Sequence, residues 1–448
     1  MKTLAQIAAE LQGYDPQAMT AASVLDFLSR LVTPVHDVLD VSLMQALGRV
    51  LAADVVSPFD VPPHDNSAMD GYAFAGSQLS PGADLELQVI GTALAGKAWQ
   101  GSVQPGQCVK IMTGAVMPAG LDTVVPQEFV ALRKSGEVEA ITIPQAVLQT
   151  GDNRRLRGED LMQGRAALLK GELITPARLG LAASLGIETL KIWRPLRVAY
   201  FSTGDEILSL GELPREGAVY DSNRYTVFGM LSRLGCEVID LGVVKDDPAL
   251  LEAAFTEAAG KADAIITSGG VSVGEADYTR AMMKKLGDVA FWRIAMRPGR
   301  PMAVGRISNA KLASNEYPAS VTSYLNHSNA NSALLFGLPG NPVAVMVTFL
   351  AFVRPALLQM MGARHEADVL LKARSVEAIR KKAGRTEYQR GSVSTGADGR
   401  LRVKTAGNQG SGVLSSMAEA NGLIVLHHGQ GNVAAGDEVD VLMFSGAA

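Results

Sequence analysis

A segment of small residues near the middle of the chain could hold a phosphate group. It reads Thr267-Ser268-Gly269-Gly270-Val271-Ser272-Val273-Gly274, and it lies between an apolar stretch at 264–266 and a helical stretch that begins near Tyr278. A strand, a Gly/Ser loop and a helix in this order present backbone N–H groups and a helix N-terminus to an anion. No Gly-Lys-Ser/Thr follows, so the segment is not a Walker A loop. An ordinary tight turn explains the same residues, so the loop alone leaves both interpretations open.

Acidic side chains stand just after several expected strands. Glu206 follows the first of these strands, Asp246 and Asp247 follow the second, and Asp277 follows the Gly/Ser loop. In open α/β sheets, ligands bind beyond the carboxyl ends of the parallel strands. Carboxylates beside a phosphate suit Mg²⁺, which takes few protein ligands and bridges phosphate oxygens. Glu206, Asp246 and Asp277 are therefore the metal candidates, although either of the two adjacent aspartates could instead cap the helix that follows.

Three arginines lie on and just past another expected strand. Arg293, Arg297 and Arg300 fall within eight residues. A guanidinium binds a tetrahedral oxyanion through two parallel hydrogen bonds. Arg293 and Arg297 are four residues apart, so a flat strand would place them on one face, and the Pro298-Gly299 turn could fold Arg300 back toward them. The apolar residues between the arginines favour an anion site over a solvated edge strand.

Other polar positions have an adequate structural explanation when each is taken alone. Asn341 follows Leu338-Pro339-Gly340 at the end of a strand, and it could simply cap the helix that starts with Pro342. Its closeness to the same sheet edge suggests a further role. Two dense polar clusters, at 65–72 and 151–160, contain Asp70 and Asp160, which could both be turn residues.

The alternation of strands and helices from 196 to about 361 predicts a central α/β domain. Strands are expected at 198–202, 238–243, 264–267, 290–295 and 334–337, and helices at about 223–234, 248–259, 278–286 and 342–361. Such alternation indicates βαβ units and a doubly wound, mostly parallel sheet. A polar run at 308–333, rich in Asn and Ser, interrupts this domain and is interpreted as an inserted surface loop.

The flanking regions differ in texture from the central one. Residues 1–50 have the amphipathic spacing of helices, whereas 51–149 and the residues after about 363 hold short β-rich runs between turns. A helix is expected at 176–185. We therefore predict a multidomain α/β plus β chain with an elongated helical N-terminal domain (1–50 and 150–190), an inserted β domain (51–149), an α/β domain (191–362) and a small C-terminal β domain (363–448).

Composition excludes several classes of protein. The chain has 448 residues and a net charge of 41 − 45 = −4, which gives no general attraction to nucleic acid or to an anionic membrane. Two cysteines and six histidines argue against a disulfide framework, a zinc site and a His-based triad. No signal peptide is evident, and the longest apolar stretch, at 343–358, is interrupted by polar residues. We expect a cytoplasmic protein that binds neither nucleic acid nor membrane.

Read together, these segments resemble the MoeA family, the molybdopterin molybdenumtransferases that include the gephyrin E domain. The resemblance runs from about Ser23 to Val441 and rests on motifs in order at 67–73, 113–115, 158–160, 202–206, 221–223, 267–277, 298–301 and 338–342. It implies Mg²⁺-dependent hydrolysis of adenylylated molybdopterin, insertion of molybdate and release of AMP. It also implies an elongated homodimer with active sites shared between subunits, and the molybdopterin adenylyltransferase is a candidate partner.

The resemblance assigns roles to particular residues. The functional acids are Asp70, Asp160, Glu206, Asp246 and Asp277. Substrate-binding positions are Thr267, Ser268, Gly269, Gly270, Ser272, Asp221, Asn223, Pro339, Gly340 and Asn341. Arg293, Arg297 and Arg300 stand where basic residues, commonly lysines, serve the anion site, and Arg390 and Ser411 match positions of the molybdate or pterin pocket. Pro-Gly-Arg-Pro in place of Pro-Gly-Lys-Pro and the insertion depart from the family pattern, and arginine changes the geometry of the anion site.

Two other functions stay open at this point. A molybdopterin adenylyltransferase, or a related nucleotide-handling enzyme, would use the same α/β domain, but it needs only that unit and the flanking β domains argue against it. A non-catalytic dimeric scaffold would retain the fold, but the acids at the sheet edge argue against that. Release of AMP from adenylylated molybdopterin would separate the transferase from the scaffold.

Overall fold

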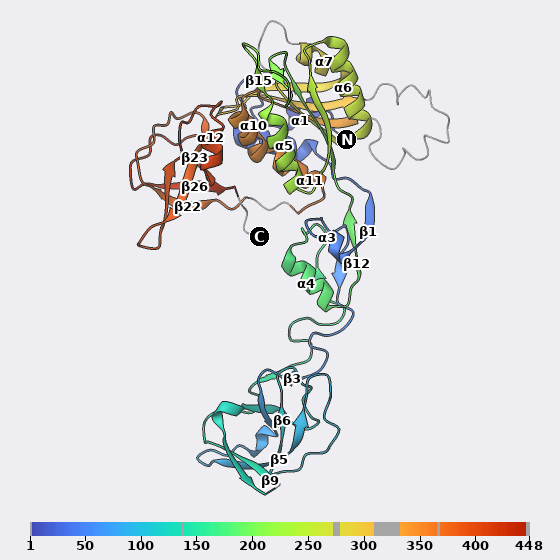
Figure 1. Cartoon of the computed structure of the whole chain (residues 1–448), viewed down its shortest axis with the longest axis vertical. Coiled ribbons are helices and arrows are strands. Elements are labelled where there is room, and N and C mark those ends of the chain that lie inside the picture. Colours follow the sequence, from blue (N-terminus) through green and yellow to red (C-terminus); the bar gives the residue numbers. More distant parts are fainter. Residues whose placement is uncertain (1, 137, 272–277, 309–331, 365–367, 445–448) are drawn as a thin grey trace, which may run out of the picture. The chain divides into compact units, whose positions relative to one another are not determined.

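The chain divides into two compact units in a computed structural model that describes residues 2–136, 138–271, 278–308, 332–364 and 368–444 (Figure 1). The larger unit comprises Met1–Ala53, Lys170–Leu179 and Glu188–Ala448, and the smaller unit comprises Asp54–Leu169 and Gly180–Ile187. The smaller unit contains most of the residues that were expected to form an inserted β domain. The finer four-domain bounds stay a prediction.

A six-stranded sheet forms the centre of the larger unit. Its order is β16 (Glu237–Val244), β13 (Arg197–Thr203), β17 (Ala264–Ser268), β21 (Ser332–Leu338), β20 (Pro301–Ser308) and β18 (Gly287–Arg293). The first four strands are parallel, whereas β20 and β18 are antiparallel to their neighbours. The sheet is therefore mixed, and the expectation of a mostly parallel sheet needs correction. A short connection joins β18 to β20, and only antiparallel neighbours can be joined without a long crossover.

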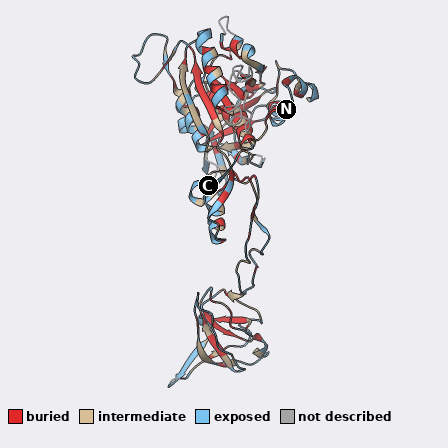
Figure 2. Cartoon of the chain, turned by 90° about the vertical axis from the view of Figure 1, so that its right-hand side faces the viewer, coloured by how far each residue is buried: buried red, intermediate tan, exposed pale blue. Residues whose placement is uncertain are grey.

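Helices pack on both faces of this sheet, as the doubly wound prediction requires. Alternate residues of β13 point to opposite sides: Tyr200 belongs to one buried cluster and Phe201 to the other. The inner strands β13, β17 and β21 are almost entirely buried, and Figure 2 shows buried strands in the sheet. The first cluster includes residues of α5 (Ser222–Arg233), α10 (Pro342–Thr348) and α11 (Arg354–Met360), and the second includes residues of α6 (Pro248–Lys261) and α7 (Tyr278–Leu286).

The long helical stretch after β21 is a core element. One π-helical turn, Phe349–Val353, joins α10 to α11. By length and composition alone Pro342–Met360 could cross a membrane, but 61% of its apolar window is buried inside the protein. Burial against the sheet explains its hydrophobicity, because a helix that is apolar all round has neighbours on several sides.

The first fifty residues are only partly helical. Helices α1 (Leu4–Glu10) and α2 (Ala21–Leu31) pack against the central cluster, but β1 (Val38–Ser42) and the short α3 (Leu43–Ala46) follow. Strand β1 pairs antiparallel with β12 (Thr189–Trp193). The fully helical expectation for 1–50 was wrong here, because the partner of β1 lies far away in the sequence.

The smaller unit is built on a six-stranded sheet in the order β7-β4-β6-β5-β9-β8. Short β-rich runs were expected over 51–149, and strands are present there. Its elements are β2 (Val55–Val56), β3 (Asn66–Ser67), β4 (Gly71–Phe74), η1 (Gly76–Gln78), β5 (Leu85–Ala93), β6 (Gln107–Ile111), β7 (Thr123–Pro126), η2 (Gln127–Phe129), β8 (Ala131–Ser135), β9 (Val138–Ile143), β10 (Arg154–Arg155) and β11 (Ala166–Leu168). Helix α4 (Pro176–Ser184) follows, where a helix was expected.

The C-terminal residues of the larger unit form a small closed barrel. Its strands are β22 (Leu371–Ser375), β23 (Thr386–Thr395), β24 (Leu401–Thr405), β25 (Gly422–Leu426) and β26 (Glu438–Met443), with α12 (Ser415–Glu419) before β25. The order β23-β24-β22-β26-β25 closes because β25 also pairs with β23. After β22, Ile379 makes an isolated antiparallel bridge to Val433.

Candidate functional site

Ten of the predicted site residues line one cavity of about 620 Å³ in the larger unit. The cavity lies beyond the carboxyl ends of β13, β16, β17 and β21, where open α/β sheets bind ligands. Its volume suits a small-molecule substrate. The ten residues are Glu206, Asp246, Gly269, Gly270, Arg297, Arg300, Pro339, Gly340, Asn341 and Ser411.

The turn after β17 depends on two glycines with positive φ. Gly269 has φ +94° and Gly270 has φ +63°. A Cβ at Gly269 would lie 2.5 Å from the carbonyl oxygen of Thr203, so a side chain has no room there. The chain can therefore approach a ligand closely at this turn. Thr267 and Ser268 are buried in β17 behind the wall, and Ser272 and Asp277 lie outside the described residues.

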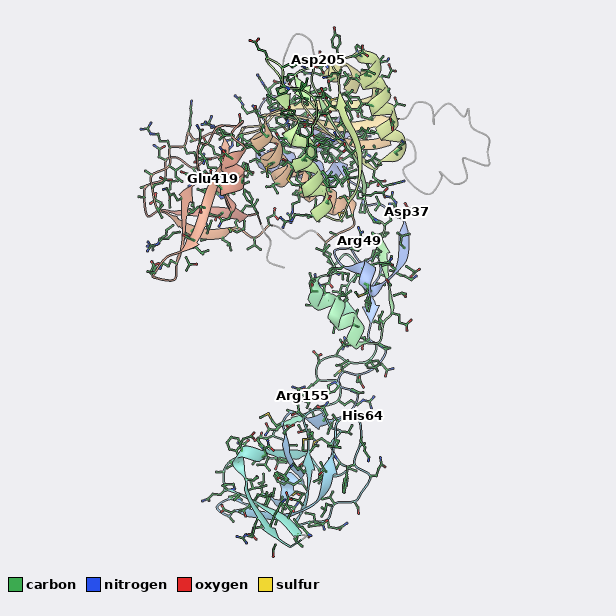
Figure 3. All side chains as sticks on the ribbon, viewed as in Figure 1. Asp37, Arg49, His64, Arg155, Asp205 and Glu419 are labelled. Carbon is green, nitrogen blue, oxygen red and sulfur yellow. The ribbon has the colours of Figure 1, made fainter. Side chains whose placement is uncertain are left out.

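Two neighbouring aspartates after β16 have different tasks. Asp247 caps α6, because its Oδ1 accepts hydrogen bonds from the amides of Ala249 and Leu250 at 2.9 Å each. Asp246 lies on the cavity wall, and its amide donates to Asp205 Oδ1 at 3.3 Å. Asp205 is labelled in Figure 3. The sequence left open which of the two aspartates caps the following helix, and the structure shows that Asp247 does.

Carboxylates for a metal are present on this wall. Glu206 and Asp246 both face the cavity. Within the described parts of the chain, no group of three or more His, Cys, Asp or Glu side chains could hold a metal ion. A pair of carboxylates fits Mg²⁺, which commonly uses one or two protein carboxylates together with substrate phosphates and water.

The arginine segment reaches the cavity through an unexpected pairing. After β18 the chain leaves the central sheet, and β19 (Met296–Arg297) pairs in parallel with β23 of the barrel. Arg297 and Arg300 consequently line the cavity, as the turn between them suggested. Arg293 is exposed at the end of β18 and does not line it, because the two arginines do not share one flat strand. Among the described residues, neither Arg297 nor Arg300 has an acidic partner within ion-pair distance.

The barrel completes the opposite wall. Asn341 occupies the N-cap position of α10, but its side chain makes no capping hydrogen bond. Its Nδ2 instead donates to Ser411 Oγ at 3.1 Å, and the carbonyl of Ser411 accepts from the amide of Val343 at 3.1 Å. The expected cap of α10 was therefore wrong. These contacts hold the Ser411 hydroxyl on the cavity wall.

Arg390 lies behind that wall rather than on it. Its side chain is buried and donates to the carbonyls of Asn408 (2.8 Å) and Gly410 (3.1 Å) and to Ser416 Oγ (3.1 Å). It borders a separate cavity of about 260 Å³, whose wall also includes Arg297. Burial, and then the charge of Arg297, lower the pKa of Arg390 to about 10. Arg390 thus fixes the loop that carries Ser411.

Asp221 and Asn223 also support the cavity from below. Asp221 Oδ1 caps α5 by accepting from the amide of Arg224 at 3.0 Å, and Asn223 Nδ2 donates to the carbonyl of Gly340 at 2.8 Å. Both side chains are buried, and Asp221 Oδ2 and Asn223 Oδ1 have no hydrogen-bond partner within the structure. These two acceptors are available to a buried water or to a substrate donor.

Sequence reasoning missed Arg385, which also lines the cavity. Its guanidinium forms an ion pair with Glu387 at 2.8 Å, and Glu387 is only 2% exposed. Nothing in the local sequence indicates this position, because Arg385 reaches the cavity through the pairing of β23 with β19. Thr203, Gly204 and Gln409 were missed as well.

Asp70 and Asp160 lie on the smaller unit. Asp70 Oδ1 accepts from the amide and the hydroxyl of Thr113, each at 2.7 Å, and these hydrogen bonds lower the pKa of Asp70. The amide of Asp160 donates to the carbonyl of Val61 at 3.0 Å. Strand β3, just before Asp70, pairs with β10, just before Asp160, so the two predicted acids come from adjoining segments.

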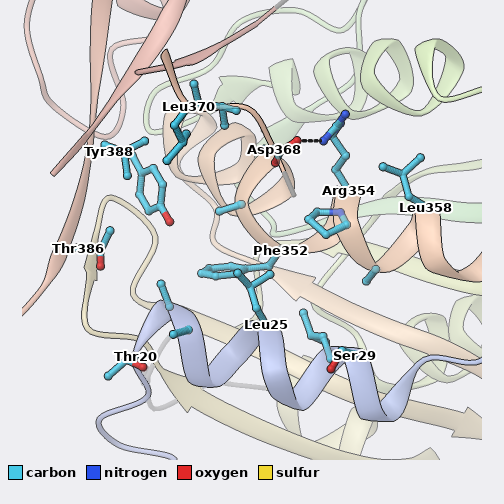
Figure 4. Close-up of a pocket in the computed structure, with 18 of the residues that line it drawn as sticks. Thr20, Leu25, Ser29, Phe352, Arg354, Leu358, Asp368, Leu370, Thr386 and Tyr388 are labelled. Atoms are coloured by element: carbon cyan, nitrogen blue, oxygen red, sulfur yellow. Dashed lines mark hydrogen bonds and ion pairs between the residues drawn. The ribbon is translucent and has the colours of Figure 1, made fainter. Parts of the chain in front are cut away.

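A larger cavity of about 750 Å³ lies elsewhere in the larger unit (Figure 4). Residues of α2, α11 and the barrel line it, including Leu25, Phe352 and Tyr388. The ion pair of Arg354 with Asp368, at 2.6 Å, crosses part of it. None of the predicted site residues that the structure describes lines this cavity, so its size alone does not make it the catalytic site.

Comparison with known proteins places this architecture in one class. Three family models match in order: "MoeA N-terminal region (domain I and II)" over residues 19–186, "Probable molybdopterin binding domain" over 199–359, and "MoeA C-terminal region (domain IV)" over 372–444. The structure of the molybdopterin biosynthesis MoeA protein from Pyrococcus horikoshii OT3 is similar, with a TM-score of 0.72 and 26% identity, over 96% of this chain and 100% of that one.

Curated relatives extend over nearly the whole chain. The molybdopterin molybdenumtransferase of Haemophilus influenzae is 40% identical over 405 residues, which cover 90% of this chain and 93% of the relative. That of Nostoc sp. is 34% identical over 433 residues, 95% and 93% of the two chains. The chain therefore belongs to the MoeA family of molybdopterin molybdenumtransferases, enzymes of molybdenum cofactor biosynthesis. The resemblance expected from the sequence is confirmed.

Proposed function

We propose that the protein uses the cavity of the larger unit to insert molybdate into adenylylated molybdopterin. The reaction depends on Mg²⁺ and releases AMP. The observation that carries this proposal is the division of charge within one cavity. Glu206 and Asp246 stand beyond the parallel strands, whereas Arg297 and Arg300 stand on the turn that reaches the barrel. A site that binds both a metal-bound phosphate and an oxyanion needs carboxylates for the metal and cationic groups for the oxyanion.

The two anionic substrates would use different parts of the wall. The Gly269-Gly270 turn lets backbone approach the phosphates of adenylylated molybdopterin. Molybdate is a tetrahedral dianion, and Arg297, Arg300 and the Ser411 hydroxyl supply charged and neutral donors on one side of the cavity. Asp221 Oδ2 and Asn223 Oδ1, buried without partners in the structure, could accept hydrogen bonds from the pterin.

Mg²⁺ would be held by Glu206 and Asp246, and Asp277 is the third candidate from the sequence. When bound, the ion would neutralise charge on the phosphate linkage that is cleaved. The chain's own contribution is to hold the two carboxylates on separate loops, which the hydrogen bond from the Asp246 amide to Asp205 joins. Arg293 and Arg390 stay predictions as substrate ligands, although neither lines this cavity.

A homodimer is part of the proposal. The family resemblance assigns Asp70 and Asp160 to the active site of the other subunit, and both lie on the smaller unit. The cytoplasmic location and an adenylyltransferase partner remain predictions of the same kind. Sedimentation at micromolar concentration should give a dimer of the 47.2 kDa chain, and a monomer alone would contradict the shared site.

The function is tested by chromatography of AMP from adenylylated molybdopterin, with omission of protein, Mg²⁺ or molybdate in turn. We expect AMP only in the complete mixture, together with activation of an apo molybdoenzyme. Pyrophosphate formed from ATP and molybdopterin would indicate an adenylyltransferase instead. Absence of both products, with the substrates still bound, would indicate a scaffold.

A further inference from the structure

Three buried hydroxyl groups form a closed ring under the catalytic cavity. Tyr200 Oη lies 2.7 Å from Ser268 Oγ and 2.9 Å from Ser202 Oγ, and the two serine oxygens lie 3.1 Å apart. The three residues are 1–2% exposed. None of them lines the catalytic cavity. The ring is therefore a second layer of polar contacts behind the wall.

The ring joins two neighbouring strands where they end. Ser202 on β13 pairs with Ser268 on β17, and Tyr200 is two residues before Ser202, on the same face of the sheet. Below the ring that face is apolar, with Val198 and Ile266 in the buried cluster. The hydroxyls are thus the last side-chain contacts between the strands before the chain enters the two cavity loops.

Those two loops touch each other directly above the ring. The last residue of β13, Thr203, and the loop after it, with Gly204 and Glu206, line the cavity, and the turn after β17 supplies Gly269 and Gly270. A Cβ at Gly269 would lie 2.5 Å from the Thr203 carbonyl oxygen, so the two segments pass each other closely at this point. A displacement of one strand end would move Glu206 relative to the glycine turn, because each follows one of the two joined strands.

Proton counting explains why the tyrosine hydroxyl matters. Each hydroxyl carries one proton and can accept at least one hydrogen bond, so three hydroxyls in a ring can each donate once and accept once. Without the tyrosine oxygen, one of the two serine protons has no acceptor in the ring. A buried donor without an acceptor raises the free energy of the folded state. A movement of the strand ends that gives this hydroxyl a new acceptor would relieve the cost.

We propose that Tyr200 is a positioning residue, whose hydroxyl locks the two loops that hold the adenylylated substrate. The inference rests on the proposed function, because it concerns the site for that substrate. Tyr200 contacts neither substrate. It acts through Ser202 and Ser268, so its loss should impair the pterin-nucleotide side of the cavity and spare the molybdate side, where Arg297 and Ser411 come from other segments.

The test is Tyr200→Phe in the full-length enzyme, with Tyr14→Phe as the matched control. Tyr14 packs against the same cluster, and its hydroxyl accepts a hydrogen bond from Trp292 Nε1 at 3.2 Å. Tyr200→Phe removes the hydrogen bonds to Ser202 and Ser268, Tyr14→Phe removes the one from Trp292, and both variants keep the aromatic side chain. We expect the KM for adenylylated molybdopterin to rise about tenfold, or 1.4 kcal/mol, in Tyr200→Phe alone, with unchanged dependence on molybdate. Equal kinetics in the two variants, or equal loss for both substrates, would overturn the proposal.

A double-mutant cycle and a measurement without turnover make the test independent of activity. If the hydroxyls act as one ring, Tyr200→Phe combined with Ser202→Ala should raise the KM no more than either change alone. Fully multiplicative effects would refute the ring. Hydrogen exchange should accelerate at the amides of Gly204 and Gly269, which donate to Val244 and Leu338, in Tyr200→Phe and not in Tyr14→Phe. Unchanged exchange would refute the positioning role, whereas a wild type that releases no AMP would refute only the proposed function.

Discussion

Two groups of arginines at or near the proposed substrate cavity use the same side chain in opposite ways. Arg297 of β19 and Arg300, just after it, have no acidic partner among the described residues. On the barrel side, Arg385 is paired with buried Glu387, and Arg390 is committed to two carbonyls and a hydroxyl. Uncompensated charge is available to an anionic substrate, whereas a guanidinium that is already hydrogen-bonded organises the backbone around it. The number of arginines near a site therefore does not identify its anion ligands.

The same division runs through the acids. Asp246 faces the cavity while its neighbour Asp247 caps α6. In the smaller unit, Asp70 is held by the amide and hydroxyl of Thr113. Substitutions can test each contrast, because a residue that supports the fold and a residue that binds substrate should differ in their effects on stability and on turnover.

The largest expected effect on stability is that of Arg390→Ala. The substitution would leave the buried carbonyls of Asn408 and Gly410 without their donor and would open a cavity, so we expect the free energy of unfolding to fall by about 3 kcal/mol. Urea denaturation measures this loss. Arg402→Ala, on the same barrel but with an exposed side chain, is the control and should change stability by less than about 0.5 kcal/mol. Normal stability with a raised molybdate requirement would instead make Arg390 a substrate ligand.

Arg297→Ala should have the opposite profile. Loss of one charge-assisted hydrogen bond, roughly 1.5–3 kcal/mol, predicts about a tenfold to hundredfold rise in the molybdate needed for half-maximal turnover. The free energy of unfolding should stay within about 0.5 kcal/mol of wild type, because no ion pair is lost. Arg297→Lys keeps the charge without the planar fork and should fall in between. Unchanged molybdate dependence with weak binding of adenylylated molybdopterin would place the phosphates, not the oxyanion, at Arg297.

The sequence predicted the parts of this site that follow from local pattern. Strands and helices alternate in the correct order from 196 to 361, so residues such as Glu206 and Gly269 were expected at the carboxyl ends of strands and are found there. The Pro298-Gly299 turn likewise indicated that Arg300 returns toward Arg297. These features depend on periodicity over a few residues and on turn chemistry.

Long-range pairing accounts for what the sequence could not predict. The chain leaves the central sheet after β18, and β19 pairs with β23, about ninety residues further along the sequence. Because of this pairing, Arg293 does not line the cavity and Arg385 does. Strand β20 was missed because Gly305 and Arg306 interrupt its apolar run. Asn341 follows the sequence rules for a helix cap, yet its amide bonds to Ser411 instead. Tertiary contacts decided each of these cases.

The adjacent pair Asp246 and Asp247 offers a smaller and sharper contrast. Asp247→Ala removes the cap of α6 and should cost about 1 kcal/mol in the free energy of unfolding, with AMP release within about twofold of wild type. Asp246→Asn should do the reverse: its stability is kept, but Mg²⁺-dependent AMP release falls, because an amide lacks the charge that holds a hard cation. Parallel denaturation and turnover measurements compare the two. Equal turnover in both variants would remove Asp246 from the metal site.

The smallest expected effect concerns Asp70 and is a dependence on pH. Hydrogen bonds from the amide and then the hydroxyl of Thr113 hold the pKa of Asp70 below its ordinary value of 3.8. A carboxyl whose pKa is lowered in the folded state stabilises that state at pH values above its unfolded-state pKa. It loses this contribution as the pH falls through its folded-state pKa.

Asp70→Asn should therefore be slightly less stable than wild type at pH 7, and the difference should vanish in acid below the folded-state pKa. Urea midpoints of both proteins across this range measure the difference. A difference in urea midpoint that stays constant with pH would mean that Thr113 does not favour the ionised carboxylate. Asp70 would then differ from Asp247, whose carboxylate stabilises the fold.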